Sequence, residues 1–275
     1  MKNLDSSINS ETLENELTIC LSNIGLNNHD NVYITGNMGL LGKIRMKKSY
    51  KLNAFLNSFW NIIGDKGTIF SPAASMNLCN TDIPFDIEST KSHEMGSFAE
   101  HIRNLPNAVR SLHPFWSIVG VGFNAHILNK VSRHAYGAGS PWSHFLNLDT
   151  VQVNVGMEPS RAVTLIHHIE TLVGVPYRYT KEFVHPILKN GKVKYEPFYQ
   201  SVFYNESNIK KRVALNEHYF NELEVRGKIQ SSMHSSGLEF KAFKMRDFYE
   251  VALEFFVDDI YNYLEEVPSV KPYRK

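Results

Sequence analysis

The feature that most constrains the fold is an alternation of helix-like and strand-like apolar patterns along the first part of the chain. Apolar side chains recur at helical spacing over 13–24 and again over 52–63, and glycines follow both runs. Short β-rich segments stand at 31–35 and 68–71, and the second is stopped by Pro72. A strand, a helix and a second strand in this order are typical of α/β proteins. The sequence therefore predicts an α/β fold.

The alternation continues to the C-terminus with one long interruption. Residues 73–94 lose all periodicity, which predicts a long surface loop, and loops of that length are often functional. Asn190-Gly191 separates two β-rich runs at 183–188 and 193–199 and predicts a hairpin, so the central sheet is expected to be mixed. The other predicted elements are helices at 95–105, 124–131, 162–173 and 246–264, and strands at 116–121 and 151–155.

Composition narrows the class of protein. Lys and Arg number 29 against 28 Asp and Glu, so no net field favours nucleic acid or an anionic membrane as partner. Hydrophobic residues make up 43%, enough for a sizeable core, and no repeat or linker divides the chain. We therefore expect one domain over 1–275. No apolar run is long enough to span a bilayer, and the N-terminus lacks the apolar stretch of a secretory signal, which predicts a cytoplasmic protein.

Cysteine and histidine usage argues against a metal. The chain has only Cys20 and Cys79 and no CxxC pair, so a disulfide framework or a thiolate zinc site is not indicated. Twelve histidines are present, but no HExxH motif is found. The sequence predicts two reduced cysteines and no metal cofactor.

A Thr-x-x-His-x-x-Glu pattern in the predicted helix 162–173 is the best candidate for catalysis. Thr164, His167 and Glu170 are spaced by three, so their side chains can share one helix face. An imidazole with a pKa of about 6.5 can take a proton at neutral pH, and a carboxylate on its other nitrogen fixes the tautomer. This arrangement suits deprotonation of an amine that attacks an acyl carbonyl. A solvated helix pair is the alternative reading, and the adjacent His168 is expected to be structural.

Two further motifs are candidate ligand sites. The glycines of Gly36-x-x-Gly39-x-x-Gly42 follow a strand and can expose backbone N–H groups to phosphate, but their spacing matches neither GxGxxG nor a P-loop. A flexible loop is the alternative. The segment Arg110-Ser-Leu-His113 places polar groups just before a strand, where α/β proteins often bind ligands. A turn capped by the histidine is the other interpretation.

Four motifs recur in an order that identifies a family. They are Thr35-Gly36-Asn37; Gly64 to Thr68 followed by Pro72; Met95 to Glu100 with Pro106 and Ala108 to Pro114; and Gly139-Ser140-Pro141 leading through Gly156 to Thr164–Glu170 and Gly174-Val-Pro-Tyr-Arg178. Over roughly residues 12–180 the chain resembles the aminoglycoside 3-N-acetyltransferases, or antibiotic acetyltransferases, which transfer acyl groups from CoA to amines. The resemblance implies a single α/β domain with a mixed central β-sheet flanked by helices.

The resemblance also implies roles for individual residues. His167 would be the general base, Glu170 its orienting carboxylate and Thr164 a supporting hydroxyl, while His113 would line the acceptor side of the cleft. Acetyl-CoA or another acyl-CoA would be the co-substrate. Its expected contacts are Thr35, Gly36, Asn37, Ser111, Gly139 and Ser140. The chain departs from the family by carrying Thr-Gly at 35–36, where the antibiotic enzymes usually have Ser-Ser.

A second departure bears on the acceptor. The segment between Gly156 and Thr164 replaces an acidic stretch and contains Arg161, and the chain has a pI of about 7.8 with Lys43 near the implied site. Positive charge favours an acceptor that carries phosphate. The sequence is similar to members from surface-polysaccharide pathways, so we expect N-acylation of an amino sugar, nucleotide-linked, by a homodimer. The alternatives are an aminoglycoside 3-N-acetyltransferase of antibiotic resistance and a non-catalytic carbohydrate-binding homologue.

Overall fold

The central feature of the fold is a mixed β-sheet. A computed structural model of the chain describes residues 10–212 and 216–274, and within them seven strands pair in the order β4-β5-β2-β1-β6-β10-β9. The three central strands β2, β1 and β6 are parallel, and the outer ones are antiparallel to their neighbours. The strands are β1 (Asn31–Gly36), β2 (Thr68–Pro72), β4 (Val109–Arg110), β5 (Ile118–Gly122), β6 (Val151–Val155), β9 (Gln230–Met233) and β10 (Glu239–Lys244). The predicted α/β fold with a mixed sheet is confirmed.

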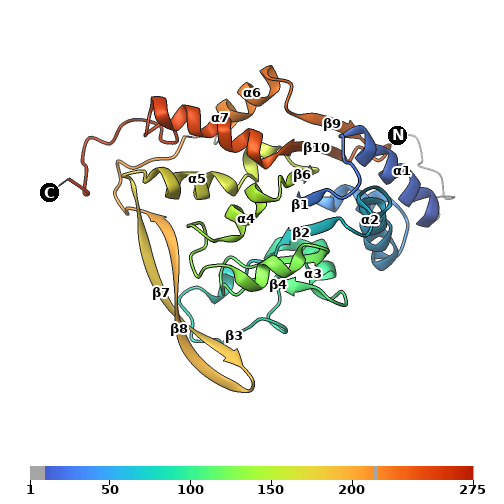
Figure 1. The fold of residues 1–275 in the computed structure, drawn as a ribbon, viewed down its shortest axis with the longest axis horizontal. Coiled ribbons are helices and arrows are strands. Elements are labelled where there is room, and N and C mark those ends of the chain that lie inside the picture. The colour runs from blue at the N-terminus through green and yellow to red at the C-terminus, as the bar shows by residue number, and fades with distance from the viewer. Residues whose placement is uncertain (1–9, 213–215, 275) are drawn as a thin grey trace.

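The mixed pairing has a different origin from the one expected. The predicted hairpin forms, with Asn190 and Gly191 both at positive φ in its turn, but it lies outside the central sheet. Its strands are twelve residues each, β7 (Arg178–Lys189) and β8 (Lys192–Phe203), and β7 also pairs with the short β3 (Phe85–Asp86). Figure 1 shows this hairpin projecting away from the body. The antiparallel strands of the central sheet come instead from β5 beside β2 and β10 beside β6.

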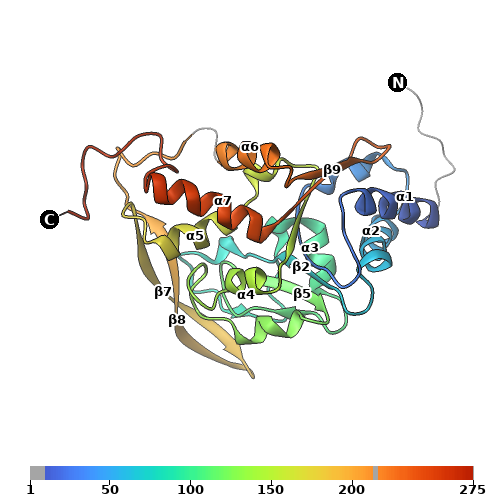
Figure 2. The ribbon, with the colours of Figure 1, turned by 45° about the horizontal axis from the view of Figure 1, so that its top comes forward.

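Helices cover both faces of the central sheet (Figures 1 and 2). Alternation along β1 explains why, because Val32 and Ile34 belong to one buried cluster and Tyr33 to the other. The first cluster packs α1, α2 and α3, and the second packs α4, α5, α6 and α7. None of the helices in the described ranges is long and apolar enough to cross a membrane. The bounds are α1 (Ser10–Asn23), α2 (Lys48–Ile63), α3 (Gly96–Arg103), α4 (Pro141–Asn147), α5 (Leu165–Val173), α6 (Glu217–Val225) and α7 (Met245–Asp258).

Several element predictions were wrong in detail. The predicted helix 124–131 is a 3-10 helix, η4 (Ala125–Lys130), and α5 begins at Leu165 because a 3-10 turn, η5 (Pro159–Arg161), precedes it. Helices α4 and α6 and strands β9 and β10 were not predicted. The last helix ends at Asp258 rather than 264, since the chain turns extended at 259. Tyr263 and Leu264 are nevertheless buried, as their helical spacing had indicated.

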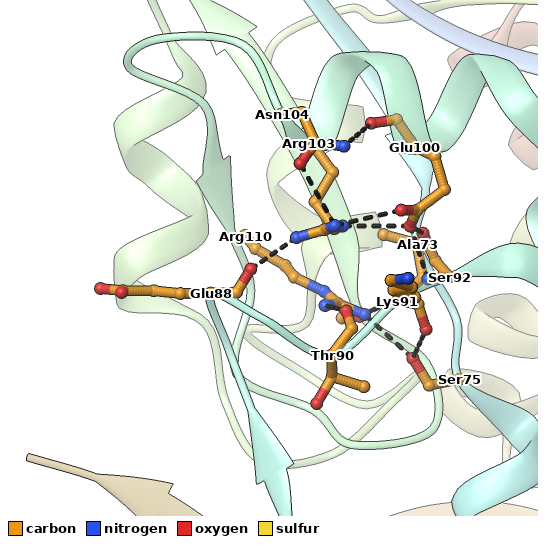
Figure 3. A network of polar contacts seen from close by, with 11 residues as sticks. Ala73, Ser75, Glu88, Thr90, Lys91, Ser92, Glu100, Arg103, Asn104 and Arg110 are labelled. Atoms are coloured by element: carbon orange, nitrogen blue, oxygen red, sulfur yellow. Dashed lines mark hydrogen bonds and ion pairs between the residues drawn. The ribbon is translucent and has the colours of Figure 1, made fainter. Parts of the chain in front are cut away.

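The long predicted loop is held to the sheet by charged hydrogen bonds (Figure 3). Buried Arg110 donates to the carbonyl oxygen of Ala73 at 2.6 Å and to that of Thr90. Glu100 of α3 accepts from the backbone N–H of Ser92 at 2.6 Å. The segment also contains β3 and two 3-10 turns, η2 (Met76–Leu78) and η3 (His93–Met95). The loop is therefore an ordered part of the fold that leads into α3.

Candidate active site

The structure brings His167 and Glu170 into direct contact on α5. His167 Nδ1 lies 2.8 Å from Glu170 Oε2, and the Glu170 side chain is fully buried while that of His167 is 23% exposed. Burial of the carboxylate rules out the alternative of a solvated helix pair. Thr164 occupies the N-cap position of α5, where its carbonyl oxygen accepts the His167 backbone N–H at 3.0 Å. Its side chain makes no capping hydrogen bond.

Two residues that the sequence analysis did not assign to the site complete the surroundings of Glu170. The Tyr177 hydroxyl donates to Glu170 Oε1 at 3.0 Å, and an Arg178 guanidinium nitrogen lies 3.0 Å from Oε2. Burial opposes ionisation of Glu170, but the Arg178 charge and the His167 hydrogen bond outweigh it and lower the pKa of the carboxyl. Both residues follow α5 in the Val-Pro-Tyr-Arg motif, which was the available signal.

The proton arrangement on His167 follows from these contacts. An ionised carboxylate can only accept, so Nδ1 carries the hydrogen and Nε2 keeps its lone pair. Burial lowers the pKa of His167, and Glu170 offsets this only in part, so the imidazole is neutral at pH 7. The ring packs between Tyr136, at 5.3 Å between centroids, and Tyr263, at 6.2 Å. The imidazole is thus a positioned base with its free nitrogen on the partly exposed side chain.

A cavity of about 520 Å³ opens at the carboxyl ends of β1, β2 and β6. Thr35, Gly36 and Asn37 line it, together with the first turns of α2 and α3. Gly36 has φ of +129°, and a Cβ there would lie 2.2 Å from the Val155 carbonyl oxygen, so only glycine fits. The ends of parallel strands are where α/β proteins bind ligands. Three of the predicted CoA contacts therefore share one cavity.

The chemistry of this cavity suits an anionic ligand. Lys48 and Lys51 line it, and Lys51 Nζ donates to the carbonyl oxygens of Leu41 at 3.0 Å and Ile44 at 3.3 Å. The Asn37 side chain accepts from the Gly39 N–H at 2.8 Å and so shapes the turn that follows β1. Lysines and the N-terminal turns of two helices attract phosphate groups. The residues present fit the phosphates of CoA.

The remaining residues with implied CoA contacts lie outside the described lining of this cavity. Gly139, at φ of +70°, precedes Ser140, which is fully buried at the N-cap position of α4. Ser111 is 1% exposed, and its Oγ accepts from the Ile118 N–H at 2.9 Å. Neither His167 nor Glu170 lines the cavity, so the cavity and the base occupy separate parts of the described site.

His113 is placed as the cap of a turn. Its Nδ1 accepts from the backbone N–H groups of Trp116 at 3.1 Å and Phe115 at 3.3 Å, and Nε2 lies 3.5 Å from the Tyr199 carbonyl oxygen. The ring is 3% exposed, and burial lowers its pKa to about 4. This geometry matches the capped-turn interpretation, because no nitrogen is left for an acceptor substrate.

The other sequence-selected groups are accounted for as follows. Arg161 is exposed on η5, and its side chain has no hydrogen bond or ion pair within the described part of the chain. His168 is buried, and its Nδ1 bonds to the Tyr136 carbonyl oxygen, in line with a structural role. Cys20 and Cys79 are both free thiols. Among the described residues, no three His, Cys, Asp or Glu side chains gather as a metal would require.

Comparison with known proteins gives the family. The family model described as aminoglycoside 3-N-acetyltransferase matches residues 37–256. Aminoglycoside N(3)-acetyltransferase III of Pseudomonas aeruginosa is 30% identical over 112 residues, which cover 40% of this chain and 41% of that protein. Aminoglycoside N(3)-acetyltransferase VII of Streptomyces paromomycinus is 24% identical over 226 residues, covering 72% of this chain and 73% of that protein.

Solved structures share the fold. Aminoglycoside acetyltransferase AAC(3)-Xa superposes with a TM-score of 0.76 at 18% identity, covering 90% of this chain and 93% of that one. The YokD protein of Bacillus subtilis has a TM-score of 0.74 at 18% identity, with the same coverage. The predicted enzyme class, an acyl-CoA-dependent N-acyltransferase, is confirmed at the level of the family. Because the family model spans the central sheet, α5 and the His167–Glu170 pair, this chain belongs to the aminoglycoside 3-N-acetyltransferase family.

Proposed function

We propose that this protein transfers an acetyl group from acetyl-CoA to a primary amine of an amino sugar, and that the acceptor is an aminoglycoside. Both curated relatives are named as aminoglycoside N(3)-acetyltransferases. Among the solved relatives, AAC-IIIb is bound to CoASH and AAC-VIa to sisomicin. These relatives support the alternative of the sequence analysis better than its main expectation, because none of them is named for a surface-polysaccharide pathway.

The observation that carries the proposal is the contact between partly exposed His167 and fully buried Glu170. With Nδ1–H held by the carboxylate, Nε2 takes a proton from the substrate amine as its nitrogen attacks the thioester carbonyl. The new C–N bond forms and the C–S bond breaks. The CoA thiolate leaves and takes the proton back from the imidazolium. An amide and CoA thiol are the products, and the base is regenerated.

The cavity at the ends of β1 and β6 is the proposed CoA site. Thr35, Gly36 and Asn37 line it, and the charges of Lys48 and Lys51 face phosphate there. Gly36 allows the chain to pass close to β6, which keeps the cavity open at this point. The Gly139–Ser140 turn and Ser111 would contribute by shape rather than by direct contact.

The test is thiol release from acetyl-CoA by the purified protein with a panel of aminoglycosides and nucleotide-linked amino sugars. We expect turnover of aminoglycosides. His167→Ala should lower kcat by about a hundredfold or more while leaving the KM for acetyl-CoA nearly unchanged, because the base acts on the amine. Near-normal kcat in that variant would overturn the assignment of the base.

A nucleotide-linked amino sugar is the second candidate acceptor, and exposed, unpaired Arg161 is the observation that favours it. An Arg–phosphate contact contributes roughly 1.5–3 kcal/mol, or about ten- to a hundredfold in kcat/KM. Turnover of a nucleotide sugar that falls by this factor in Arg161→Gln would support it. Turnover of aminoglycosides alone would exclude it. Binding of acetyl-CoA without any turnover would point to the non-catalytic homologue.

A further inference from the structure

Arg178 is the most completely held arginine around the proposed base. One of its terminal nitrogens lies 3.0 Å from Glu170 Oε2 and 3.1 Å from His167 Nδ1, and the other donates to the Ser201 carbonyl oxygen at 3.2 Å. The guanidinium carbon lies 3.9 Å from the centre of the Phe203 ring. The side chain is 6% exposed. Contacts on two sides and a ring beneath it leave the guanidinium a single orientation.

The contact with His167 restricts where protons can sit. The Arg178 nitrogen carries hydrogens only, so it can donate to Glu170 Oε2 or to a bare Nδ1, but Nδ1 can satisfy Glu170 only by carrying a hydrogen itself. While the arginine donates to the carboxylate, that carboxylate stays ionised and takes the Nδ1 hydrogen. The lone pair is then left on Nε2. In the opposite tautomer Nε2 carries the hydrogen and cannot accept one from an amine.

The charges around His167 decide how readily it becomes an imidazolium. Glu170 on its own helix favours the charged form, while Arg178 from β7 and Lys211 from the segment after β8 oppose it. The other titratable groups packed here are the hydroxyls of Tyr136 and Tyr263, beside the ring, and Tyr177, which donates to Glu170. These hydroxyls are buried and have raised pKa values, so they stay neutral across the working range.

We infer that Arg178 is a positioning residue, which holds the His167–Glu170 pair in the one tautomer that leaves Nε2 free and keeps the imidazole uncharged. The inference rests on the proposed function, since it concerns the same base. Without Arg178, Glu170 would be a fully buried carboxylate whose only cationic partner is an imidazolium. The pair would then hold an extra proton at neutral pH. A base that already carries that proton cannot deprotonate the amine.

The experiment compares Arg178→Gln with Arg178→Lys, and uses Arg133→Gln as a matched control. Arg133 also pairs with a glutamate, Glu196, and lies 5.0 Å over a phenylalanine ring, but on the hairpin. The readouts are the pH profile of kcat/KM and the tautomer and pKa of His167, measured by ¹⁵N NMR of labelled imidazoles and assigned with His167→Gln. The NMR measurement needs no acceptor substrate.

In the wild type, NMR should find the hydrogen of His167 on Nδ1. Arg178→Gln should move the acid limb of the profile and the NMR pKa upward together by about one unit or more, so that activity falls about tenfold at pH 6 and far less at pH 9. Arg178→Lys keeps the charge and should return the limb close to its original position. Arg133→Gln should change neither readout.

The failures of this inference and of the proposed function are distinguishable. If wild-type protein acetylates no amine, the proposed function fails, but the NMR tautomer and pKa still test the role of Arg178. If wild-type protein is active and Arg178→Gln retains both the wild-type pH profile and the wild-type His167 pKa, Arg178 is not a positioning residue. An Nε2–H tautomer in the wild type overturns the inference even if Arg178→Gln does not fold.

Discussion

At the scale of residues, the site depends on a carboxylate without solvent contact and an imidazole with some. Glu170 accepts from His167, Tyr177 and Arg178, so its buried charge is satisfied on both oxygens. Burial lowers the pKa of His167 beneath its usual value of 6.5. These two opposite shifts separate a permanently charged partner from a neutral base, which is how one pair can move a proton near pH 7.

The pH dependence follows from the direction of the His167 shift. A depressed pKa keeps the base unprotonated as the pH falls through 6.5, so the acid limb of kcat/KM should have its midpoint below about 6.5. The profile is measured with saturating acetyl-CoA and a subsaturating amine, after correction for the titration of the amine itself. A midpoint at or above pH 7 would contradict the depressed pKa.

Replacing Glu170 by Gln should reduce kcat by less than replacing His167 by Ala. The amide keeps a similar shape but can offer its N–H to Nδ1, which favours the wrong tautomer without removing the imidazole. We expect a loss of about tenfold or more, measured under the same conditions as the His167→Ala variant. Glu170→Gln activity equal to the wild type would remove Glu170 from the mechanism.

At the scale of elements, two segments without long regular structure shape the site. The first runs from β2 to α3 and is fastened by Arg103 and Arg110. Arg103 forms two hydrogen bonds of 3.0 Å with the two oxygens of Glu100 (Figure 3). Burial opposes the charge of Glu100, but the hydrogen bonds from Arg103 and Ser92 lower its pKa to about 2. The segment leads into α3, whose first turn lines the proposed CoA cavity.

Glu100→Gln should therefore destabilise the protein at pH 7 in a pH-dependent way. The folded pKa lies below the unfolded value of 4.5, so the stabilisation is present above about pH 4.5 and is lost as the pH falls towards about 2. The free energy of unfolding is measured with urea at several pH values. The gap between wild type and variant should be largest at pH 7 and shrink in acid. Glu88→Gln is the control, because Glu88 takes part through its backbone oxygen.

The second segment is the C-terminal strap, residues 259–264, which follows α7. Leu264 pairs with Lys211 by a β-bridge, and Tyr263 is 3% exposed against His167 and Phe203. The family model ends at 256, so this wall of the site lies beyond the matched range. Its contacts explain why 260–264 carry a helical apolar pattern without being helical.

Tyr263→Ala should remove one wall beside the His167 ring. We expect a stability loss of about 3 kcal/mol or more, as for other large buried aromatic side chains, and a lower kcat because the imidazole is less constrained. Tyr263→Phe keeps the ring and should stay near wild type in both measurements. Urea unfolding and steady-state kinetics test the pair of variants. Wild-type kcat in a folded Tyr263→Ala protein would show that the strap does not position the base.

At the scale of the whole molecule, the proposed CoA cavity joins several elements that are distant in sequence. Residues from β1, β6, α2 and α3 line it. A ligand that binds only the folded state stabilises all of them at once. The predictions of a single domain over 1–275, of a homodimer and of a cytoplasmic location remain predictions.

Acetyl-CoA should raise the melting temperature. At about 100 times its Kd the stabilisation is about 2.7 kcal/mol, which corresponds to roughly 5–10 °C for a protein of this size. His167→Ala should show the same shift, because the base lies outside the cavity lining. Lys48→Gln should show a smaller one. A wild-type protein that melts at the same temperature with millimolar acetyl-CoA would refute CoA binding in this cavity.

Much of the site was predictable because its key pair is local. Thr164, His167 and Glu170 follow helical geometry, and contacts across one helical turn are dictated by backbone hydrogen bonding alone. The turn at Gly36 is also local, since its conformation admits only glycine. His113 was open to two readings, because burial of its ring depends on β8, which lies far along the chain.

What the sequence by itself determined was periodicity: which segments form helices and strands, where glycine ends them, and that His167 and Glu170 meet. Only the tertiary structure decided that Arg178, Lys211 and Tyr263 surround that pair, and that the hairpin lies outside the central sheet. The physical reason is range. Helical and strand patterns arise from contacts within a few residues, whereas the neighbours of His167 are set by packing between segments up to about a hundred residues apart.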